Sequence, residues 1–573
     1  MSFVVAASVI AAVPTVAAPP PESDGRNDRR PNVVFLFADD WGRHASVYAE
    51  RPLCPDGPID PLCEIVETPN IDSVARRGVT FTRAFVGSPS CTPCRSSLMS
   101  GRHFWQTGRA SILINARWDG TIPTWPERLR QSGYHIGLTH KAWSPGEPKD
   151  AMYGGDRSQY RPAGGMDNHF GQDAMRMIRR GRAVDEVRAT FRDRVRRNFT
   201  AFLDDRNDDS RPFHYFYGPM NVHRKYEPGS GRALWNLDPD DLRGRMPPYL
   251  PDVVTVREDL TDYVGEVMAF DTAVGVIVDE IRSRGLTDQT VVIISGDHGP
   301  PGFPHGKCNL YDFGTSVALI VAGPDVRTGE WADDPVCLPQ LCPTILEMTG
   351  ADPIEGLPNR SLVDVLTVGG QTESSDTPVD GTDVPKNGSD VEPDNGQDVD
   401  PRTAPAVFFG RERHVGNARA DYRPYPQRAI RTSDHLFIIN FRSDRWPLGD
   451  PYRLNGDNPP TFDEVARDTR VTVPDEDAGP TKAAIITGRD APEMRPFFQH
   501  AYGKRPGEEL YDLRRDPHQM RNVVAADGYA DTADVLRRRL MDELRRTDDP
   551  RLVDGGQFFE TPPMTDVPEK YRR

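Results

Sequence analysis

The sequence predicts an α/β fold, in which helices cover both faces of a large sheet. Several short segments rich in β-branched and aromatic residues are apolar on both faces, which is typical of strands buried inside such a sheet. A helical pattern over residues 261–284 lies between two of them, as expected for alternating strands and helices. The chain of 573 residues is long enough to bury a large core. The predicted strands are residues 32–37, 134–138, 213–217, 291–294 and 317–321.

The C-terminal part of the chain has a different pattern. Residues 407–409, 435–441 and 509–513 are predicted strands, and a charged helix follows over residues 531–546. This pattern predicts a small antiparallel sheet with one helix packed on it. The sequence therefore predicts a smaller C-terminal α+β subdomain.

The beginning of the chain has the composition of a targeting segment. Residues 1–18 are small and apolar and end in Val16, Ala17 and Ala18, which favours a signal peptide and a secreted or periplasmic protein. The stretch lacks a basic start, so a mis-assigned start codon or a disordered tail is the alternative. Residues 19–30 are rich in Pro, Asp and Arg and are predicted to be a linker.

A second break in composition divides the chain. Residues 367–404 contain nine acidic and two basic residues and almost nothing to bury, which predicts an acidic disordered insertion. A calcium-binding tract is the alternative reading. The break separates a large N-terminal unit, residues 31–366, from the C-terminal subdomain, residues 405–573.

The overall charge and composition exclude two classes of protein. The chain has 70 Lys and Arg residues against 86 Asp and Glu residues, a formal charge of −16, so it lacks the basic surface of a nucleic-acid binder. Hydrophobic residues make up 37%, too few for a polytopic membrane protein, and no later segment offers a membrane span.

Two predicted strands end in the same kind of residue pair. Residues 32–37 lead into Asp39 and Asp40, and residues 291–294 lead into Asp297 and His298. Ligands of open α/β sheets gather at the carboxyl ends of the strands, so these side chains can converge. Carboxylates with one further ligand suit Ca²⁺ or Mg²⁺. Helix capping would explain either pair alone, but both pairs at matching strand ends favour a metal site.

A cysteine motif lies between these pairs, in the sequence SPSCTPCRSSLMSGRHF. Cys91 and Cys94 form a C-x-x-C, which alone suggests a redox pair or half of a zinc site. No second pair of ligands follows, and the surroundings are not those of a thioredoxin. Pro93 suits a first helical turn, whose free N–H groups can bind an anion, and Arg95 adds donors at the same place.

The run Cys-x-Pro-x-Arg-x-x-x-Met-x-Gly-Arg resembles the signature of type I sulfatases, in which the first Cys is oxidised to Cα-formylglycine. Further segments resemble the same family and follow in its order over nearly the whole chain. They are PNVVFLFADDWG (31–42), Lys141 at a strand end, PFHYFYGPMNVHRKYEPGSG (212–231), SGDHG (295–299), FPHGKCNLYDFGT (303–315) and ELYDLRRDPHQMRNV (509–523). His223 with Arg224, and the run 306–311, most resemble the heparan N-sulfatase (N-sulfoglucosamine sulfohydrolase) branch.

The resemblance implies an alkaline-phosphatase-like fold, with a large mixed, mostly parallel sheet flanked by helices and a smaller C-terminal subdomain. It implies a formylglycine nucleophile at Cys91 and one Ca²⁺ ion, with Mg²⁺ as the alternative. A formylglycine-generating or equivalent maturation enzyme would then be a partner. The implied metal ligands are Asp39, Asp40, Cys91, Asp297 and His298, and the implied catalytic residues are Cys91, Arg95, Lys141, His223 and Lys307.

Some positions depart from the family pattern or stay open. The family's G-K-x-H reads His140-Lys141-Ala142-Trp143 here, so Trp143 replaces a histidine expected to contact sulfate or the leaving group. His298 stands where many relatives have Asn, and imidazole remains a competent ligand. Arg224 and His414 are candidate substrate-binding residues, and a packing or solvent role is favoured for His305.

The other cysteines allow up to three disulfides in an exported protein, with Cys54–Cys63 and Cys337–Cys342 close in sequence. A bond between Cys91 and Cys94 would block modification and is disfavoured. A polyanionic substrate on an acidic protein also predicts a locally basic cleft, built partly from Arg43 and the basic residues named above.

The expected activity is removal of sulfate from a sulfated saccharide, with the N-sulfate of glucosamine in heparan-type glycans favoured. Three alternatives remain at this point. The first is an O-sulfatase on another sulfated polysaccharide, and the second is a phosphomonoester or phosphonate hydrolase of the same superfamily. The third is a glycan- or calcium-binding protein that kept the fold and lost the chemistry.

Overall fold

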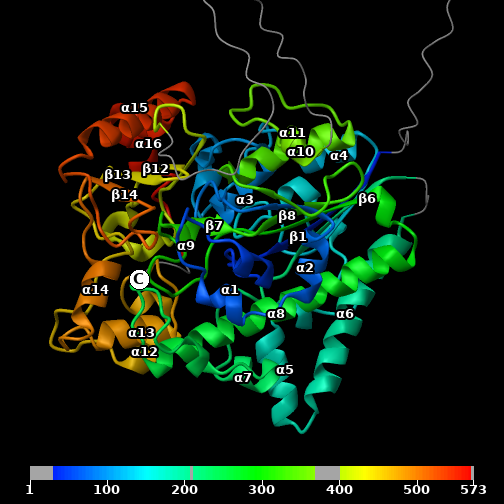
Figure 1. Ribbon diagram of the computed structural model, residues 1–573, viewed down its shortest axis with the longest axis horizontal. Coiled ribbons are helices and arrows are strands. Elements are labelled where there is room, and N and C mark those ends of the chain that lie inside the picture. The colour runs from blue at the N-terminus through cyan, green and yellow to red at the C-terminus, as the bar shows by residue number, and fades with distance from the viewer. Residues whose placement is uncertain (1–29, 207–210, 368–399, 570–573) are drawn as a thin grey trace, which may run out of the picture.

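The computed structural model describes residues 30–206, 211–367 and 400–569. Its centre is a seven-stranded sheet in the order β4-β5-β1-β6-β8-β2-β9 (Figure 1). Within these described residues only β8 runs antiparallel to its neighbours, so the sheet is mixed and mostly parallel, as predicted. The strands are β1 (Asn32–Ala38), β2 (Gly78–Phe81), β4 (His135–His140), β5 (Phe213–Gly218), β6 (Thr290–Gly296), β8 (Leu319–Ala322) and β9 (Glu330–Ala332).

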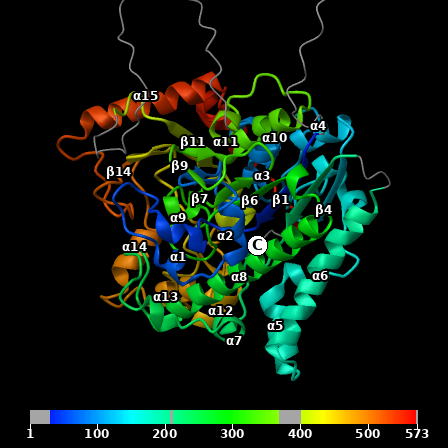
Figure 2. The ribbon, with the colours of Figure 1, turned by 45° about the vertical axis from the view of Figure 1, so that its right-hand side comes forward.

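Strand β1 shows why the sheet is covered on both faces. Its side chains alternate, so Val34 and Leu36 join one core cluster while Val33 and Phe35 join the other. Both clusters are fully buried, because helices pack on each face (Figure 2). The first face carries α2 (Pro69–Ala75), α5 (Phe170–Arg179), α6 (Val184–Asp204) and α8 (Val254–Ser283); the second carries α3 (Cys91–Ser100), α4 (Trp125–Gln131) and α10 (Leu341–Thr349).

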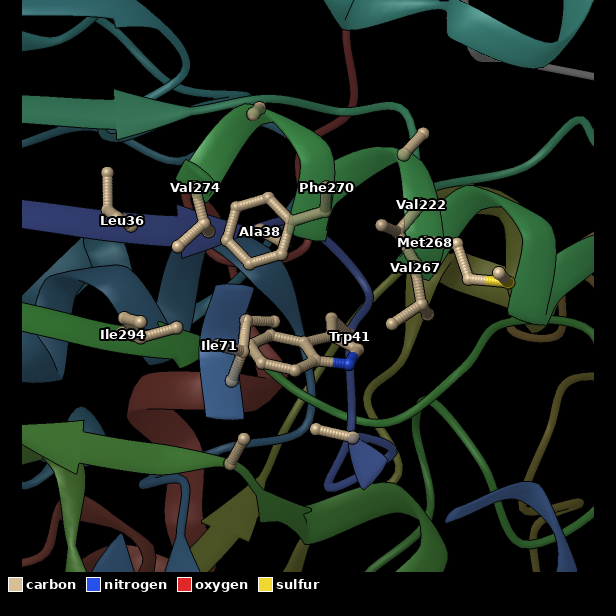
Figure 3. Packing of buried hydrophobic residues seen from close by; sticks show 14 of the residues in the cluster. Leu36, Ala38, Trp41, Ile71, Val222, Val267, Met268, Phe270, Val274 and Ile294 are labelled. Atoms are coloured by element: carbon tan, nitrogen blue, oxygen red, sulfur yellow. The ribbon is translucent and has the colours of Figure 1, made fainter. Parts of the chain in front are cut away.

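Helix α8 is the main support of the first face. Its Phe270 packs on the ring of Trp41, just beyond β1, with 5.2 Å between ring centroids (Figure 3). The helix begins at Val254, seven residues before the predicted start, because Val256 and Leu260 also enter the core. This contact fixes the end of β1, where the paired acids follow.

The C-terminal part forms a separate antiparallel sheet in the order β11-β12-β13-β14, as predicted. Helix α15 (Ala530–Arg546) packs on it through Leu536 and Leu540. The strands are β11 (Ala406–Arg411), β12 (Gln427–Thr432), β13 (His435–Asn440) and β14 (Glu508–Asp512). A third, small sheet of β10 (Val336–Cys337), β3 (Ala84–Phe85) and β7 (Ser316–Val317) lies beside it.

The C-terminal sheet packs directly against the larger unit. Phe85 stacks on Phe409 with 6.0 Å between centroids, and the buried Arg431 of β12 pairs with Asp312 at 2.8 Å. The contact between the two units is therefore buried and contains an ion pair.

Several sequence predictions fall outside the described residues. These are the signal peptide at 1–18, almost all of the linker at 19–30, and most of the acidic insertion at 367–404. The division into units at 31–366 and 405–573 stays a prediction. Across the described residues, no helix combines the length and the apolar character needed to cross a bilayer.

Candidate active site

The strand ends meet at one edge of the sheet. Strands β4, β5, β1 and β6 are parallel neighbours, and their carboxyl ends lead into Lys141, the loop of His223, Asp39, and Asp297 respectively. Asp40 adopts a φ of 62°, which lets its backbone N–H donate to Asp297 Oδ1 at 2.8 Å. This hydrogen bond links the two residue pairs predicted from the sequence, Asp39 with Asp40 and Asp297 with His298.

Cys91 faces this edge from the first turn of α3. The helix follows extended Ser90 and ends at Gly101, whose φ of 71° suits glycine. Its first N–H groups have no partner within the helix, so the positive end of its dipole lies at Cys91. The Cys91 thiol lies 3.9 Å from Asp40 Oδ1 and is only 2% exposed. Burial, with the charge of Asp39, raises the pKa of this thiol well above its usual value.

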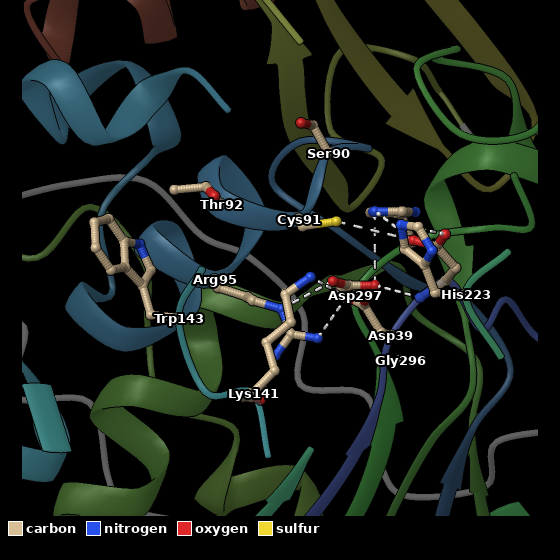
Figure 4. Close-up of polar contacts among 12 residues, drawn as sticks. Asp39, Ser90, Cys91, Thr92, Arg95, Lys141, Trp143, His223, Gly296 and Asp297 are labelled. Carbon is tan, nitrogen blue, oxygen red and sulfur yellow. Dashed lines mark hydrogen bonds and ion pairs between the residues drawn. The ribbon is translucent and has the colours of Figure 1, made fainter. Parts of the chain in front are cut away.

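Asp39 is held by two cations. Its Oδ1 accepts hydrogen bonds from Lys141 Nζ at 2.6 Å and Arg95 Nη2 at 2.9 Å, and Arg95 Nε also donates to Asp297 Oδ2 at 2.9 Å (Figure 4). Burial would raise the pKa of Asp39, but Lys141 and Arg95 outweigh it and hold the pKa well below the usual value. Asp39 is therefore ionised, and Arg95 bridges the two strand ends.

The carboxylate of Asp40 has three basic side chains around it. Lys307 Nζ lies 3.1 Å from its Oδ2, His223 Nε2 lies 3.6 Å from the same oxygen, and His298 Nε2 lies 3.3 Å from Oδ1. His223 Nδ1 donates to its neighbour's carbonyl at 2.5 Å, which leaves Nε2 as an acceptor toward Lys307 at 3.4 Å. The side chain of His223 is 32% exposed, whereas those of Asp40 and Lys307 are buried, so solvent reaches the cluster beside His223.

The cluster fits a divalent cation. Ligand atoms of Asp40, Cys91 and His298, and likewise those of Asp39, Cys91 and Asp297, lie within 4.8 Å of one another. Asp39 Oδ2 and His298 Nε2 are buried and lack a hydrogen-bond partner, which is costly unless a ligand engages them. Three carboxylates and one imidazole are the donors that Ca²⁺ or Mg²⁺ would accept. All five predicted metal ligands thus lie in one place.

Arg224 departs from its prediction as a substrate-binding residue. Its guanidinium forms a paired contact with Asp259 of α8, at 2.8 and 2.7 Å, and its Nε donates to Pro301 O at 2.7 Å. The group lies between the rings of Tyr226 and Phe303 and is 4% exposed. Its donors are engaged by Asp259 and Pro301, so the geometry gives Arg224 a structural role.

His414 lies next to the cluster, beside the residue that precedes Cys91. Its Nδ1 is 2.8 Å from Ser90 Oγ, the residue before Cys91, and the side chain is buried. Burial, with the charge of Lys307, lowers the pKa of His414 to about 3, so the ring is neutral. Direct contact between His414 and substrate stays a prediction.

Trp143 stands at the position of the family's histidine but does not take over its expected contact with sulfate or the leaving group. It is fully buried behind α3, and its Nε1 donates to Ser96 Oγ at 2.8 Å, so it lies apart from the charged side chains (Figure 4). His305 packs between Tyr249 and Tyr311, with centroids at 4.4 and 4.1 Å, in line with its expected packing role.

Two further sequence predictions need correction. All seven cysteines lie within the described residues and all are free and buried, so neither Cys54–Cys63 nor Cys337–Cys342 forms a disulfide. Arg43 does not join the cluster either; it lines a separate cavity of about 80 Å³ together with His305.

One residue of the site was missed. Asp477, from the C-terminal part, places its Oδ2 3.2 Å from Lys307 Nζ. The acidic run 475–477 is visible in the sequence, but nothing local to it indicates a neighbour 170 residues earlier, so only the packing of the two units reveals it.

The sulfatase family model matches residues 31–351. The chain belongs to the sulfatase family. As a sulfatase it is a hydrolase of sulfuric esters, and the match covers the whole sheet edge described above. The family resemblance noted from the motifs is therefore confirmed.

Relatives of this sulfatase act on varied substrates. The chain is 25% identical to N-sulphoglucosamine sulphohydrolase of Homo sapiens over 556 residues, which is 91% of each chain. It is 24% identical to an ulvan-active sulfatase of Formosa agariphila, over 59% of this chain and 65% of the relative. The fold is also that of the phosphonate monoester hydrolase of Agrobacterium radiobacter, with a TM-score of 0.55 and 17% identity over 91% and 97% of the two chains.

Proposed function

We propose that this sulfatase removes the N-sulfate of glucosamine in heparan-type saccharides, using a formylglycine made from Cys91 and one Ca²⁺ ion. The observation that carries the proposal is the position of Cys91, at the start of α3 and against the buried carboxylate of Asp40. The similarity to N-sulphoglucosamine sulphohydrolase along 91% of both chains supports this substrate over other sulfated sugars.

An unmodified Cys91 would be a poor nucleophile here. Burial raises its thiol pKa well above the usual value, so the reactive thiolate would be scarce at neutral pH. Hydrated formylglycine would supply two hydroxyls, one to attack sulfur and one to expel sulfate afterwards as the aldehyde reforms. A bound divalent cation would supply a Lewis acid for the sulfate oxygens.

The residues around Cys91 would bind and orient the sulfate. Arg95 and Lys141 are fixed on Asp39, with Lys141 Nζ at 2.6 Å, so neither needs to reorganise when charge develops on the sulfate. The three cations Arg95, Lys141 and Lys307 face four carboxylates, those of Asp39, Asp40, Asp297 and Asp477. A divalent cation would then leave a positive excess, which favours an anionic substrate.

The leaving nitrogen would depart on the side of His223 and Lys307. His223 is the member of the cluster that solvent reaches, and Lys307 is its neighbour at 3.4 Å. The leaving amine must gain a proton as the sulfur–nitrogen bond breaks. The Lys307 ammonium carries protons beside this exit, whereas the Nδ1 proton of His223 is engaged by the Arg224 carbonyl.

Export and maturation complete the proposal. The composition of residues 1–18 favours secretion or a periplasmic location, where sulfated polysaccharides are met. A formylglycine-generating or equivalent enzyme must act on Cys91 before folding is complete, because the folded chain buries this residue to 2% exposure.

The first experiment is the mass of the tryptic peptide spanning Cys91, from protein made in its native host. A loss of about 18 Da relative to cysteine is expected for formylglycine. Unmodified cysteine would contradict the mechanism and favour the non-catalytic glycan-binding alternative.

Substrate class is tested next with defined heparin disaccharides. Incubation with an N-sulfated disaccharide should release inorganic sulfate and a free amine together. Release from O-sulfated but not N-sulfated sugars would instead identify an O-sulfatase. Turnover of a phosphonate monoester alone would favour the phosphomonoester or phosphonate hydrolase alternative. The three ligand groups found among the described residues all belong to one cluster, which suits a single metal ion.

A further inference from the structure

The ammonium group of Lys307 stands between the two parts of the molecule. On one side it lies 3.1 Å from Oδ2 of Asp40, at the end of β1, and on the other 3.2 Å from Oδ2 of Asp477, in the C-terminal part. His223 Nε2 is its third neighbour, at 3.4 Å. The Lys307 side chain is 3% exposed, so these groups take the place of water.

Asp477 is carried on a rigid segment. Two residues before it, Asp475 is buried and accepts from Arg411 at 2.9 Å and Arg419 at 2.8 Å. Immediately after it, the N–H of Ala478 donates to Thr469 Oγ1 at 2.9 Å. The neighbours are therefore anchored, and the carboxylate of Asp477 is aimed at Lys307.

Among the described residues, the Asp477 carboxylate forms an ion pair with Lys307 alone, and its buried Oδ2 has no hydrogen-bond partner. Burial would raise the pKa of Asp477, but Lys307 and His223 outweigh it and hold the pKa below its usual value, so the group is charged. A free carboxylate beside an anion-binding cluster would repel the substrate. Its charge is offset here by Lys307, which gives a reason for its presence.

A bound cation would give Lys307 a need for the Asp477 carboxylate as its ion-pair partner. Asp40 lies among the groups that would hold the metal, so its charge would then be shared with the ion. Lys307 would keep a full ion pair only with Asp477. Without that pair, a buried ammonium beside a divalent cation is repelled and turns away.

We propose that Asp477 is a positioning residue, which holds the Lys307 ammonium beside the leaving nitrogen when the metal site is filled. The inference rests on the proposed function, since that function assigns Lys307 to protonate the leaving nitrogen. The C-terminal part would then contribute directly to the chemistry carried by the larger unit.

The first test measures the position of Lys307 without measuring activity. Ca²⁺-loaded wild type and Asp477→Asn are treated briefly with acetic anhydride, and labelling of each lysine is followed by peptide mass spectrometry. Labelling of Lys307 should rise several-fold in Asp477→Asn. Labelling of Lys141, which is buried on Asp39 at 2.6 Å, should not change and serves as the internal control.

The second test is a double-mutant cycle on sulfate release from an N-sulfated heparin disaccharide. Asp477→Asn should lower kcat about tenfold with KM changed less than about threefold. In a Lys307→Met background the same substitution should cost nothing further, because the group it positions is gone. Asp490→Asn, at an exposed aspartate of the same part, is the matched control and should match wild type.

The outcomes separate this inference from the proposed function. Unchanged Lys307 labelling in Asp477→Asn overturns the inference, as does an equal loss of kcat in the Lys307→Met background. Increased Lys307 labelling in a protein without activity on any sulfated sugar would support the positioning role and contradict the proposed function.

Discussion

At the scale of single residues, the cluster at the sheet edge is a set of paired buried charges. Arg95 is fully buried and joins Asp39 to Asp297. Lys141 is a second cation on Asp39, and Lys307 pairs with Asp40. Buried charges of this kind persist only where each has a partner. Cys91 lies among them, and in the proposed mechanism its thiol is converted to formylglycine before it reacts.

Replacing Cys91 tests that role. Cys91→Ala should abolish sulfate release, by about 10³-fold or more, because the nucleophile is removed. Its thermal unfolding midpoint should stay near that of wild type, since a small side chain replaces another. Cys94→Ala, one turn later on α3, is the matched control and should retain both formylglycine and activity; loss of activity in both variants alike would point to a helix defect.

At the scale of elements, α8 acts as a frame for the loops around the site. Its buried acids bind the ends of other segments: Asp271 accepts from the N–H groups of Asn70 and Ile71 at the start of α2, and Glu266 accepts from the N–H of Gly171 in α5. Asp259 holds Arg224, next to His223. One helix thus positions several loops by side-chain capping.

The Arg224–Asp259 contact gives a prediction at this scale. Arg224→Met should lower the free energy of unfolding by about 3–5 kcal/mol, because it leaves Asp259 charged and unpaired in the interior. The KM of the folded fraction should hardly change. Urea unfolding and steady-state kinetics check this; a large rise in KM with unchanged stability would restore Arg224 as a substrate contact.

At the scale of the whole molecule, buried titratable groups set the pH range of stability. Burial raises the pKa of Asp271 to about 7 and that of Glu266 to about 8. Burial also lowers the pKa of His214 and of His414 to about 3. The acids bind more protons when folded, and the histidines bind fewer, so the two sets act in opposite directions.

We therefore expect Glu266 to make the protein less stable as the pH rises from 6.5 to 8. Glu266 keeps a proton only in the folded state there, so its contribution favours unfolding by on the order of 2 kcal/mol. The buried histidines, which are still partly protonated in the unfolded chain near pH 6.5, offset part of this loss. Below pH 6.5 the buried histidines oppose further gain as the pH falls. Chemical denaturation across this range measures the slope, which Glu266→Gln should flatten; Glu493→Gln, at an exposed position, should leave it unchanged.

Metal binding should also stabilise the whole fold. Added Ca²⁺ at about 100 times its dissociation constant should stabilise chelator-treated protein by about 2.7 kcal/mol, because the folded state alone assembles the ligands. Calorimetric unfolding with and without Ca²⁺ measures the effect. In Asp297→Asn the stabilisation should largely disappear, and its full persistence would place the cation elsewhere.

The amino-acid sequence was enough to predict the α/β class, five of the seven strands of the main sheet and the cluster residues other than Asp477; strands β2 and β9 were missed. Strands apolar on both faces must be covered on both sides, and acids directly after parallel strands must share an edge. These are local patterns with one physical solution. The motif around Cys91 could likewise be recognised in the sequence, because a single helical turn sets the spacing of its residues.

Roles that depend on partners distant in the sequence became visible in the folded protein alone. Strand β12 was missed because its Arg428 and Arg431 suggest a surface, yet both are buried on acids far along the chain, Asp549 and Asp312. Arg224 was predicted to bind the substrate because it follows His223 in the sequence, but its guanidinium binds Asp259 of α8. Asp477 reaches Lys307 through the packing of the two units. A charged side chain does not by itself indicate whether it is exposed, structural or functional, because its role depends on the counter-charge that the fold places beside it.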